Sequence, residues 1–189
     1  MKPKKALLII DMQKGSFTSK TPRHDTDGVV KRINELASML RESGDPVIFV
    51  QHDGSIENAF IPGTIDWELL DELEVKSTDL VICKTANDAF YQSQLESTLK
   101  EMNVTGLFIT GCATDFCVES TIQSALIKDY SIVIVSDAHT TGDRPHLPAK
   151  KVIEHYNWVW QNMIPTRGKI QVKGLEEIQK EWLTESRKS

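Results

Sequence analysis

The chain has 189 residues, of which 40% are hydrophobic and 26% are charged, and its net charge at pH 7 is −5. These values are typical of one globular domain with a sizeable core, which we expect to span residues 1–189. The negative charge argues against nucleic acid and anionic membranes as partners. No apolar run approaches the roughly 18 residues of a membrane span.

Apolar runs alternate with amphipathic stretches along the chain. Strands are expected at residues 6–11, 47–51, 80–83, 106–110 and 131–136, with a weaker sixth strand near 169–172. Helices are expected at residues 27–43, 92–103, 117–129, 147–163 and 174–183. Residues 52–67 show no clear period, so they are predicted to form a surface loop near the strand ends. The alternation predicts an α/β protein, a three-layer α/β/α sandwich with a mostly parallel sheet of five to six strands.

The N-terminus and the cysteines indicate a cellular compartment. The first lysines are soon followed by an acid, which is not the pattern of a signal peptide. The chain has three cysteines, an odd number that does not form a disulfide framework. We therefore expect reduced thiols and a cytoplasmic location.

Three residues with reactive side chains end or follow expected strands: Asp11, Lys84 and Cys117. Each can instead have a purely structural role. Asp11 can cap a turn, Lys84 can lie on a solvated rim, and Cys117 can be a small buried thiol. Because the carboxyl ends of parallel strands meet at one edge of a sheet, we expect the three to face one crevice. There, a carboxylate, an ammonium and a thiol can act as base, electrostatic partner and nucleophile.

The position of Cys117 in the first turn of an expected helix bears on its protonation. Thr114 or Asp115 is expected to cap that helix, because their side-chain oxygens accept hydrogen bonds from unpaired N–H groups. Those N–H groups and the positive end of the helix dipole favour a thiolate at Cys117. Cys83, by contrast, alternates with neighbouring strand residues and is expected to face the core.

At these residues the sequence resembles the isochorismatase-like cysteine hydrolases, which include nicotinamidases, N-carbamoylsarcosine amidases, ureidoacrylate hydrolases and isochorismatase itself. The resemblance runs from "LLIIDMQ" to about Ile164, and "GCATDFCVEST" is its most specific piece. "VICKTANDAFY" and "SDAHTT" agree with it in order and spacing. The resemblance implies an isochorismatase-like, Rossmann-like fold and hydrolysis of a small-molecule amide or carbamoyl C–N bond through a thioester. It also implies that Asp11, Lys84 and Cys117 form a catalytic triad.

Further site residues follow from the resemblance. It implies an oxyanion hole made of the backbone N–H groups of Ala113 and Cys117, and a cis peptide bond between Cys112 and Ala113. The substrate pocket is expected to be lined by aromatic and polar residues near the motifs: Phe17, His52, Trp67, Asn87, Phe90, Tyr91, Thr114 and Phe116. An aromatic lining suits a planar or apolar substrate. Judged from the residues alone, each aromatic side chain can equally pack in the core, and the polar ones can cap turns.

One departure from the nicotinamidase pattern concerns metal binding. Nicotinamidases carry an Asp-x-His metal site after the second strand, where this chain has Gln51, His52 and Asp53. Adjacent residues at a strand end point to opposite sides, so His52 and Asp53 are poorly placed to share a metal. We therefore predict no metal and no cofactor, with His52 as a pocket or turn residue and His139 as a structural one.

The expected partner is a small-molecule substrate, together with further copies of the chain. The helix at residues 147–163 is apolar over a wide arc, which indicates a homodimer or larger homo-oligomer unless the chain itself buries that face. Three functions stay open. The first is amide or carbamoyl hydrolysis, of which nicotinamidase activity is one case. The second is isochorismatase-type vinyl ether hydrolysis, which needs no thiol. The third is a non-catalytic role as a partner protein. The intact set of Asp, Lys and Cys favours the first.

Overall fold

The computed structural model describes residues 4–186, within which the chain forms six strands, five α-helices and two short helical turns. The strands are β1 (Lys4–Ile10), β2 (Val47–His52), β3 (Leu80–Lys84), β4 (Val104–Cys112), β5 (Ser131–Thr140) and β6 (Ile170–Lys173). The α-helices are α1 (Thr26–Glu42), α2 (Leu95–Glu101), α3 (Glu119–Ile127), α4 (Ala149–Gln161) and α5 (Leu175–Ser186). The short turns are η1 (Lys14–Ser16), of 3₁₀ type, and η2 (Thr114–Val118), of π type.

All six strands belong to one sheet in the order β3-β2-β1-β4-β5-β6, and every neighbouring pair is parallel. The chain builds the sheet outward from β1 to β3, then returns to the other side of β1 and builds outward again to β6. The direction of winding therefore reverses between β1 and β4. The predicted parallel sheet is confirmed, including its weaker sixth strand.

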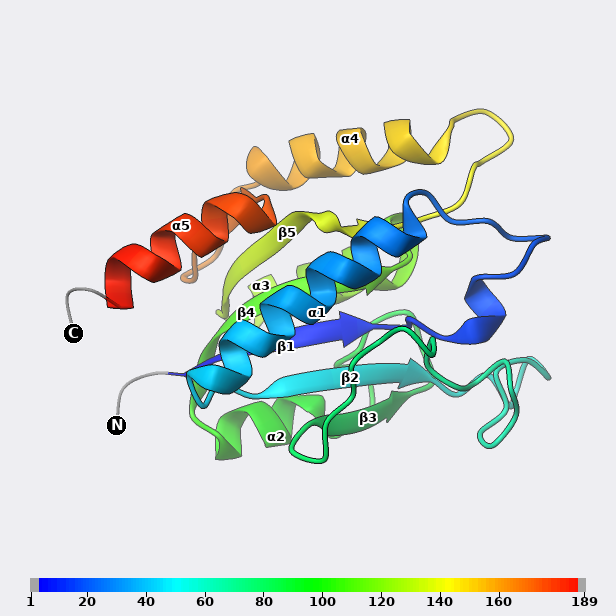
Figure 1. Cartoon of the computed structure of the whole chain (residues 1–189), viewed down its shortest axis with the longest axis horizontal. Helices are drawn as coiled ribbons and strands as arrows, with labels where there is room; N and C mark the ends of the chain where they lie inside the picture. Colours follow the sequence, from blue (N-terminus) through cyan, green and yellow to red (C-terminus); the bar gives the residue numbers. More distant parts are fainter. Residues whose placement is uncertain (1–3, 187–189) are drawn as a thin grey trace.

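Helices cover both faces of the sheet, which gives the three predicted layers (Figure 1). Helices α1 and α5 pack on one face, against alternate residues of β1 such as Leu7 and Ile9. Helices α2, α3 and α4 pack on the other face, against Leu8 and Ile10. The central strands are apolar on both sides because both of their faces are covered.

The start of α3 differs from the prediction. The helix begins at Glu119, and the π turn η2 occupies the place of its expected first turn. Neither predicted cap forms. The Thr114 hydroxyl lies 2.9 Å from His139 Nδ1, and Arg144 Nε donates to Asp115 Oδ2 at 2.7 Å. The capping prediction is wrong because tertiary partners occupy both side chains.

Gly111, near the end of β4, is required by the backbone. Its φ is +119°, and a Cβ built there would clash with the backbone of Ile10 on β1. We expect Gly111→Ala to lower the free energy of unfolding by about 3 kcal/mol, because left-handed strain adds to that clash. Urea unfolding measures the loss.

Gly44→Ala is the matched control for this prediction. Gly44 also has a positive φ, +73°, but open space surrounds its built Cβ. It should lose only about 1 kcal/mol. Equal losses in the two variants would show that the contact with β1 does not matter.

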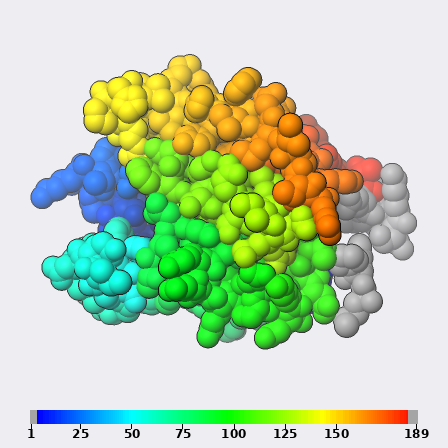
Figure 2. All heavy atoms as spheres, turned by 180° about the vertical axis from the view of Figure 1, so that it is seen from behind, coloured from blue at the N-terminus to red at the C-terminus, as the bar shows by residue number. Residues whose placement is uncertain are grey.

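The carboxyl ends of the strands lie at the end of the molecule where two long connections project. One contains η1 and leads to α1 (blue), and the other joins β2 to β3 (cyan to green). The space-filling view from behind shows the blue segment and the cyan part of the second connection projecting at that end (Figure 2). Both connections therefore lie near the strand ends that carry the candidate site.

Helix α4 is the expected subunit interface. The chain itself buries one side of it, where Trp160 is fully covered, while Trp158 is 64% exposed on another side. The wide apolar arc is thus explained in part by burial within one chain, and the homo-oligomer stays a prediction. Among residues 4–186, no helix combines the length and apolar character needed to span a membrane.

Candidate active site

Three candidate catalytic side chains meet where the winding of the sheet reverses. Asp11 directly follows β1, Lys84 ends β3, and Cys117 lies in η2 after β4. Lys84 Nζ is 2.6 Å from Asp11 Oδ2 and 3.5 Å from Cys117 Sγ. A reversal point at the carboxyl ends of the strands is the general ligand site of open α/β sheets. The structure therefore brings together the three residues that the strand ends predicted.

Asp11 and Lys84 form a buried ion pair. The Lys84 side chain is fully covered, the Asp11 side chain is 8% exposed, and Lys84 Nζ also donates to the carbonyl oxygen of Ala86 at 2.9 Å. Burial raises the pKa of Asp11, and the positive charge of Lys84 opposes that rise. Among the described residues, Asp11 Oδ1 is buried without a hydrogen-bond partner. One carboxylate oxygen is thus held by Lys84, and the other can accept a proton.

Cys117 is half-buried beside this pair. Burial, and next the negative charge of Asp11, raise the pKa of the Cys117 thiol above its usual value, against the opposing charge of Lys84. The expectation of a resting thiolate is therefore wrong, because desolvation outweighs both the lysine and the helix terminus. The resting group is a thiol that lies next to a carboxylate able to take its proton.

The turn before Cys117 provides the backbone groups of the site. The peptide bond between Cys112 and Ala113 is cis, at the position that the resemblance implies. Ala113 and Cys117 both line the same cavity, as an oxyanion hole built from their N–H groups requires. Burial raises the pKa of the Cys112 thiol to about 12, so this second cysteine stays protonated and unreactive.

A cavity of about 220 Å³ opens beside these groups. It is lined by residues from the strand ends and from both long connections: Asp11, Gln13, Ser16, Arg23, His52, Phe60, Asn87, Cys112, Ala113, Phe116, Cys117 and Arg144. Three predicted pocket residues, His52, Asn87 and Phe116, lie there. Asn87 Oδ1 is 3.5 Å from Cys117 Sγ, within reach of a group bound to the sulfur. Burial, and next the charge of Lys84, lower the pKa of His52, so the imidazole is neutral at pH 7.

Three other predicted pocket residues do not line this cavity. Phe90 is buried in the core and stacks on Tyr130 with ring centroids 5.8 Å apart. Tyr91 is 53% exposed at the surface, and the hydroxyl of Thr114 is buried against His139. Burial lowers the pKa of His139 to about 4, which supports its predicted structural role.

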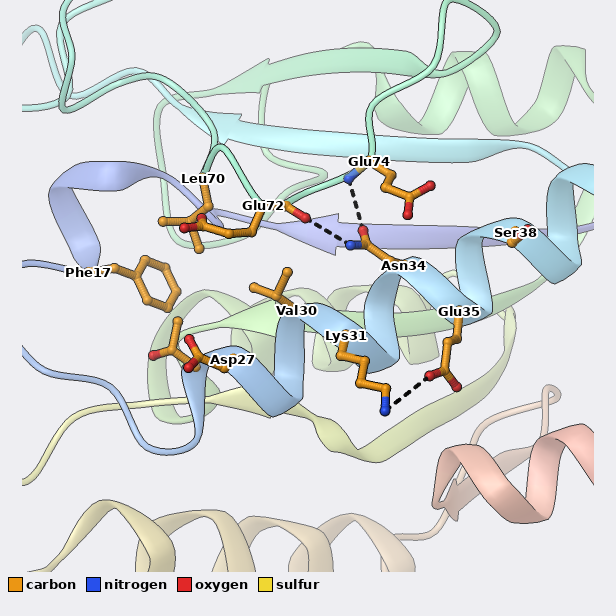
Figure 3. Close-up of a pocket in the computed structure, with 11 residues that line it drawn as sticks. Phe17, Asp27, Val30, Lys31, Asn34, Glu35, Ser38, Leu70, Glu72 and Glu74 are labelled. Carbon is orange, nitrogen blue, oxygen red and sulfur yellow. Dashed lines mark hydrogen bonds and ion pairs between the residues drawn. The ribbon is translucent and has the colours of Figure 1, made fainter.

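Phe17 and Trp67 also lie outside the cavity. Trp67 acts through its backbone, where its carbonyl oxygen accepts a hydrogen bond from Gln13 Nε2 at 3.0 Å. Phe17 points into a larger cavity of about 630 Å³ between α1 and the chain before β3 (Figure 3). That cavity is lined mainly by acidic and apolar side chains, and Asn34 closes one side by binding the backbone of Glu72 and Glu74. It contains none of the predicted catalytic residues, so we place the chemistry in the smaller cavity.

Cys83 is exposed, so the expectation that it faces the core is wrong. It alternates with Ile82 and Lys84, which are buried, and therefore points to the opposite face of β3. β3 is an edge strand, and its second face is only partly covered.

Five lining residues were not predicted from the sequence: Gln13, Ser16, Arg23, Phe60 and Arg144. Gln13 had a usable signal, because it lies just beyond the end of β1, close to Asp11. Arg144 follows the "SDAHTT" motif, which also ends a strand. Arg23 carries no such signal, because only the folding of the connection before α1 brings it to the cavity.

The structure also bears on metal binding. Among residues 4–186, no group of three or more His, Cys, Asp or Glu side chains is arranged to hold a metal ion. Asp53 Oδ1 instead accepts a hydrogen bond from the backbone N–H of Ser55 at 3.0 Å, so it is used in its own turn. The absence of a metal and a cofactor stays a prediction.

A parallel α/β sandwich with Asp, Lys and Cys at its strand ends is the arrangement expected of a cysteine-dependent hydrolase, and comparison with known proteins shows the fold and the family. Residues 5–163 match the isochorismatase domain, and the chain belongs to that family. Streptothricin hydrolase from Streptomyces noursei is 32% identical over 148 residues, which cover 78% of this chain but only 59% of the relative. Ureidoacrylate amidohydrolase RutB from Stutzerimonas stutzeri is 29% identical, over 72% of this chain and 70% of the relative. A crystal structure of an isochorismatase family protein superposes with a TM-score of 0.81 at 31% identity, over 90% of this chain and 96% of that one.

Proposed function

We propose that this protein hydrolyses an amide or carbamoyl C–N bond of a small molecule, with Cys117 as nucleophile. The observation that carries the proposal is the contact of one buried lysine with both other groups, 2.6 Å from Asp11 Oδ2 and 3.5 Å from Cys117 Sγ, beside a small cavity. Two relatives act on substrates consistent with this class, judged by their names as a streptothricin hydrolase and a ureidoacrylate amidohydrolase.

The first half of the proposed reaction forms a thioester. Asp11 takes the proton of the Cys117 thiol as Sγ attacks the carbonyl or carbamoyl carbon. The C=O π electrons move to the oxygen, and the N–H groups of Ala113 and Cys117 donate hydrogen bonds to that oxyanion. Asp11 then passes its proton to the departing nitrogen, the C–N bond breaks, and ammonia or an amine leaves. Lys84 keeps the negative charge of Asp11 stable in a buried place.

The second half releases the product. A water molecule attacks the thioester carbon while Asp11 accepts one of its protons. The C–S bond breaks, and the sulfur regains a proton from Asp11. The carboxylic or carbamic acid leaves, and both side chains return to their starting states. The raised pKa of Asp11 suits this repeated proton exchange, because a group with a pKa nearer neutrality accepts and donates more readily.

The test is ammonia release from a panel of small amides and carbamoyl compounds. The panel contains nicotinamide, N-carbamoyl amino acids, ureidoacrylate-like acids, biuret and maleamate, together with a streptothricin-type lactam followed by mass. Turnover of at least one compound is expected. Failure of the whole panel would count against C–N hydrolysis.

The pH dependence of turnover follows from the two raised pKa values. Below the raised pKa of Asp11 the carboxyl group is protonated and cannot accept the thiol proton, so activity falls as pH falls. Above it Asp11 is ionised, and the raised pKa of Cys117 keeps the thiol protonated. We expect kcat/KM to rise through one ionisation above 3.8, the usual pKa of an aspartate, and then to stay level past about pH 8.5.

The profile is measured with the best substrate of the panel, and circular dichroism at each pH controls for unfolding. An alkaline fall below about pH 8 would mean that a low-pKa thiol or another acid limits the reaction. A plateau that reaches down to pH 4 would contradict the raised pKa of Asp11.

A further inference from the structure

Two of the positively charged side chains around the small cavity are paired with a carboxylate, and a third is not. Asp11 is paired with Lys84 at 2.6 Å. Arg144 is paired with Asp115 through two hydrogen bonds, Nε to Oδ2 at 2.7 Å and Nη2 to Oδ1 at 2.8 Å. These two pairs each sum to zero charge. The remaining cation in the lining is Arg23.

Arg23 forms no ion pair among the described residues, and its Nε donates a hydrogen bond to the carbonyl oxygen of Ser16 at 2.8 Å. This bond leaves the two Nη groups of a guanidinium fork without a carboxylate. Arg23 is partly buried beside a cavity that also contains the proposed nucleophile. A partly desolvated cation with free donors is a binding group for an anion.

Neighbouring residues hold Arg23 in place beside the cavity. The next residue, His24, is tied to the end of β5, because its N–H donates to the carbonyl oxygen of Thr141 at 3.0 Å and its carbonyl accepts from the Thr140 hydroxyl at 2.6 Å. Gly142 lies against the guanidinium, where a Cβ would come within 2.7 Å of Arg23 Nη1. A preorganised donor binds more tightly, since less side-chain entropy is lost on binding.

We propose that Arg23 binds a carboxylate of the substrate, so that the protein acts on small acids that bear an amide or carbamoyl group. The inference rests on the proposed function and narrows its substrate class. A planar guanidinium matches a carboxylate in geometry, and the charge of Arg23 is the one that the cavity leaves unneutralised. The cavity volume of about 220 Å³ restricts the occupant to a short molecule.

Alkylation of Cys117 tests the anion site without requiring turnover. Iodoacetate and iodoacetamide have the same length and the same leaving group, but only iodoacetate carries a negative charge. Peptide mass spectrometry at pH 9 gives the ratio of the two rates at each cysteine. Because both reagents meet the same thiol, the thiolate fraction cancels in that ratio. Exposed Cys83 serves as the internal reference.

We expect the iodoacetate to iodoacetamide ratio at Cys117 to exceed that at Cys83 by about tenfold, and Arg23→Gln to remove the difference. Lys20→Gln is the matched control, because it removes one positive charge from an exposed position in the same connection. It should change the ratio by less than about twofold. Gly142→Ala keeps the charge but displaces the guanidinium, and should give an intermediate ratio.

An unchanged ratio in Arg23→Gln would overturn the anion site, and so would an equal fall in Lys20→Gln. The raised pKa of the Cys117 thiol slows both reagents alike, so loss of turnover in Cys117→Ala, rather than the absolute rate of alkylation, tests the proposed nucleophile.

Turnover gives a second readout that separates the two proposals. N-carbamoylglycine and its methyl ester differ only in the carboxylate, and ammonia release follows the carbamoyl group in both. We expect wild type to prefer the acid by about tenfold or more in kcat/KM, and Arg23→Gln to lose that preference through a higher KM for the acid. Equal turnover of acid and ester by wild type would support the hydrolase but overturn the carboxylate site.

Discussion

Replacing the sulfur nucleophile is expected to abolish hydrolysis. Cys117→Ala should lower kcat/KM for the best amide or carbamoyl substrate by at least about 10⁴-fold, because the other thiol in the cavity lining, Cys112, stays protonated and cannot replace the nucleophile. Asp11 and Lys84 alone leave only water attack assisted by a buried carboxylate. The measurement is ammonia release under single-substrate kinetics, with mass spectrometry of the wild-type protein to detect an acyl-enzyme.

Cys83→Ala controls for the loss of a thiol as such. Cys83 is exposed on the edge strand and does not line the cavity, so its variant should keep wild-type turnover. Full activity of Cys117→Ala on the true substrate would contradict covalent catalysis. It would favour the vinyl ether reaction instead, in which proton transfer by the aspartate suffices.

The fold and the reactive centre were predictable for the same physical reason. Alternating strand and helix patterns dictate a parallel sheet, and parallel strands bring their carboxyl ends to one edge. Asp11, Lys84 and Cys117 each lie at such an end, so their positions along the chain were enough to predict that they meet. The resemblance to a family added their roles, together with the cis bond after Cys112.

The cavity wall was less predictable, because the residues between strand ends follow tertiary contacts rather than periodicity. Phe90 stands beside a motif, yet its ring turns into the core against Tyr130. Arg23 stands beside no motif, yet hydrogen bonds of the neighbouring residue to β5 carry it to the cavity. Cys83 shows a related limit: alternation tells which residues share a face of β3, but not whether that face is covered.

The protonation of Cys117 was predicted wrongly for an energetic reason. A helix terminus stabilises a thiolate by a modest amount, about 0.3–1 kcal/mol at exposed positions. Desolvation of a buried charge costs more than that, and here it comes with a neighbouring carboxylate. Sequence position reveals the first effect but not the depth of burial.

The second large effect is expected from the buried ion pair between Asp11 and Lys84. Lys84→Met leaves the carboxylate buried without its counter-charge, and this should lower the free energy of unfolding by about 3–5 kcal/mol at pH 8. Asp11→Asn leaves the ammonium in the same position and should cost a similar amount. Asp11 has a φ of +47°, a region that asparagine also tolerates, so the backbone is not strained by that change. Activity should fall by at least about 10³-fold in either variant.

The double variant Asp11→Asn/Lys84→Met separates stability from catalysis. With both charges gone, no unpaired ion is buried, so most of the lost stability should return. Activity should not return, because the proton acceptor is still missing. Urea unfolding and ammonia release are measured on wild type, the two single variants and the double variant, which together form a double-mutant cycle. Recovery of activity together with stability would mean that Asp11 and Lys84 only support the fold.

The free energy of unfolding of Lys84→Met should depend on pH, and this dependence tests whether an unpaired carboxylate causes the loss of stability. Its sign follows from the linkage between proton binding and folding. In the folded variant the pKa of Asp11 lies above its unfolded value, because burial raises it and Lys84 no longer opposes the rise. The folded state then binds the proton more tightly than the unfolded state, so stability falls as pH rises from the ordinary aspartate value through the raised one. The deficit relative to wild type should therefore be complete at pH 8 and shrink as pH approaches about 4. A deficit that is constant across this range would show lost packing of the lysine stem rather than an unpaired carboxylate.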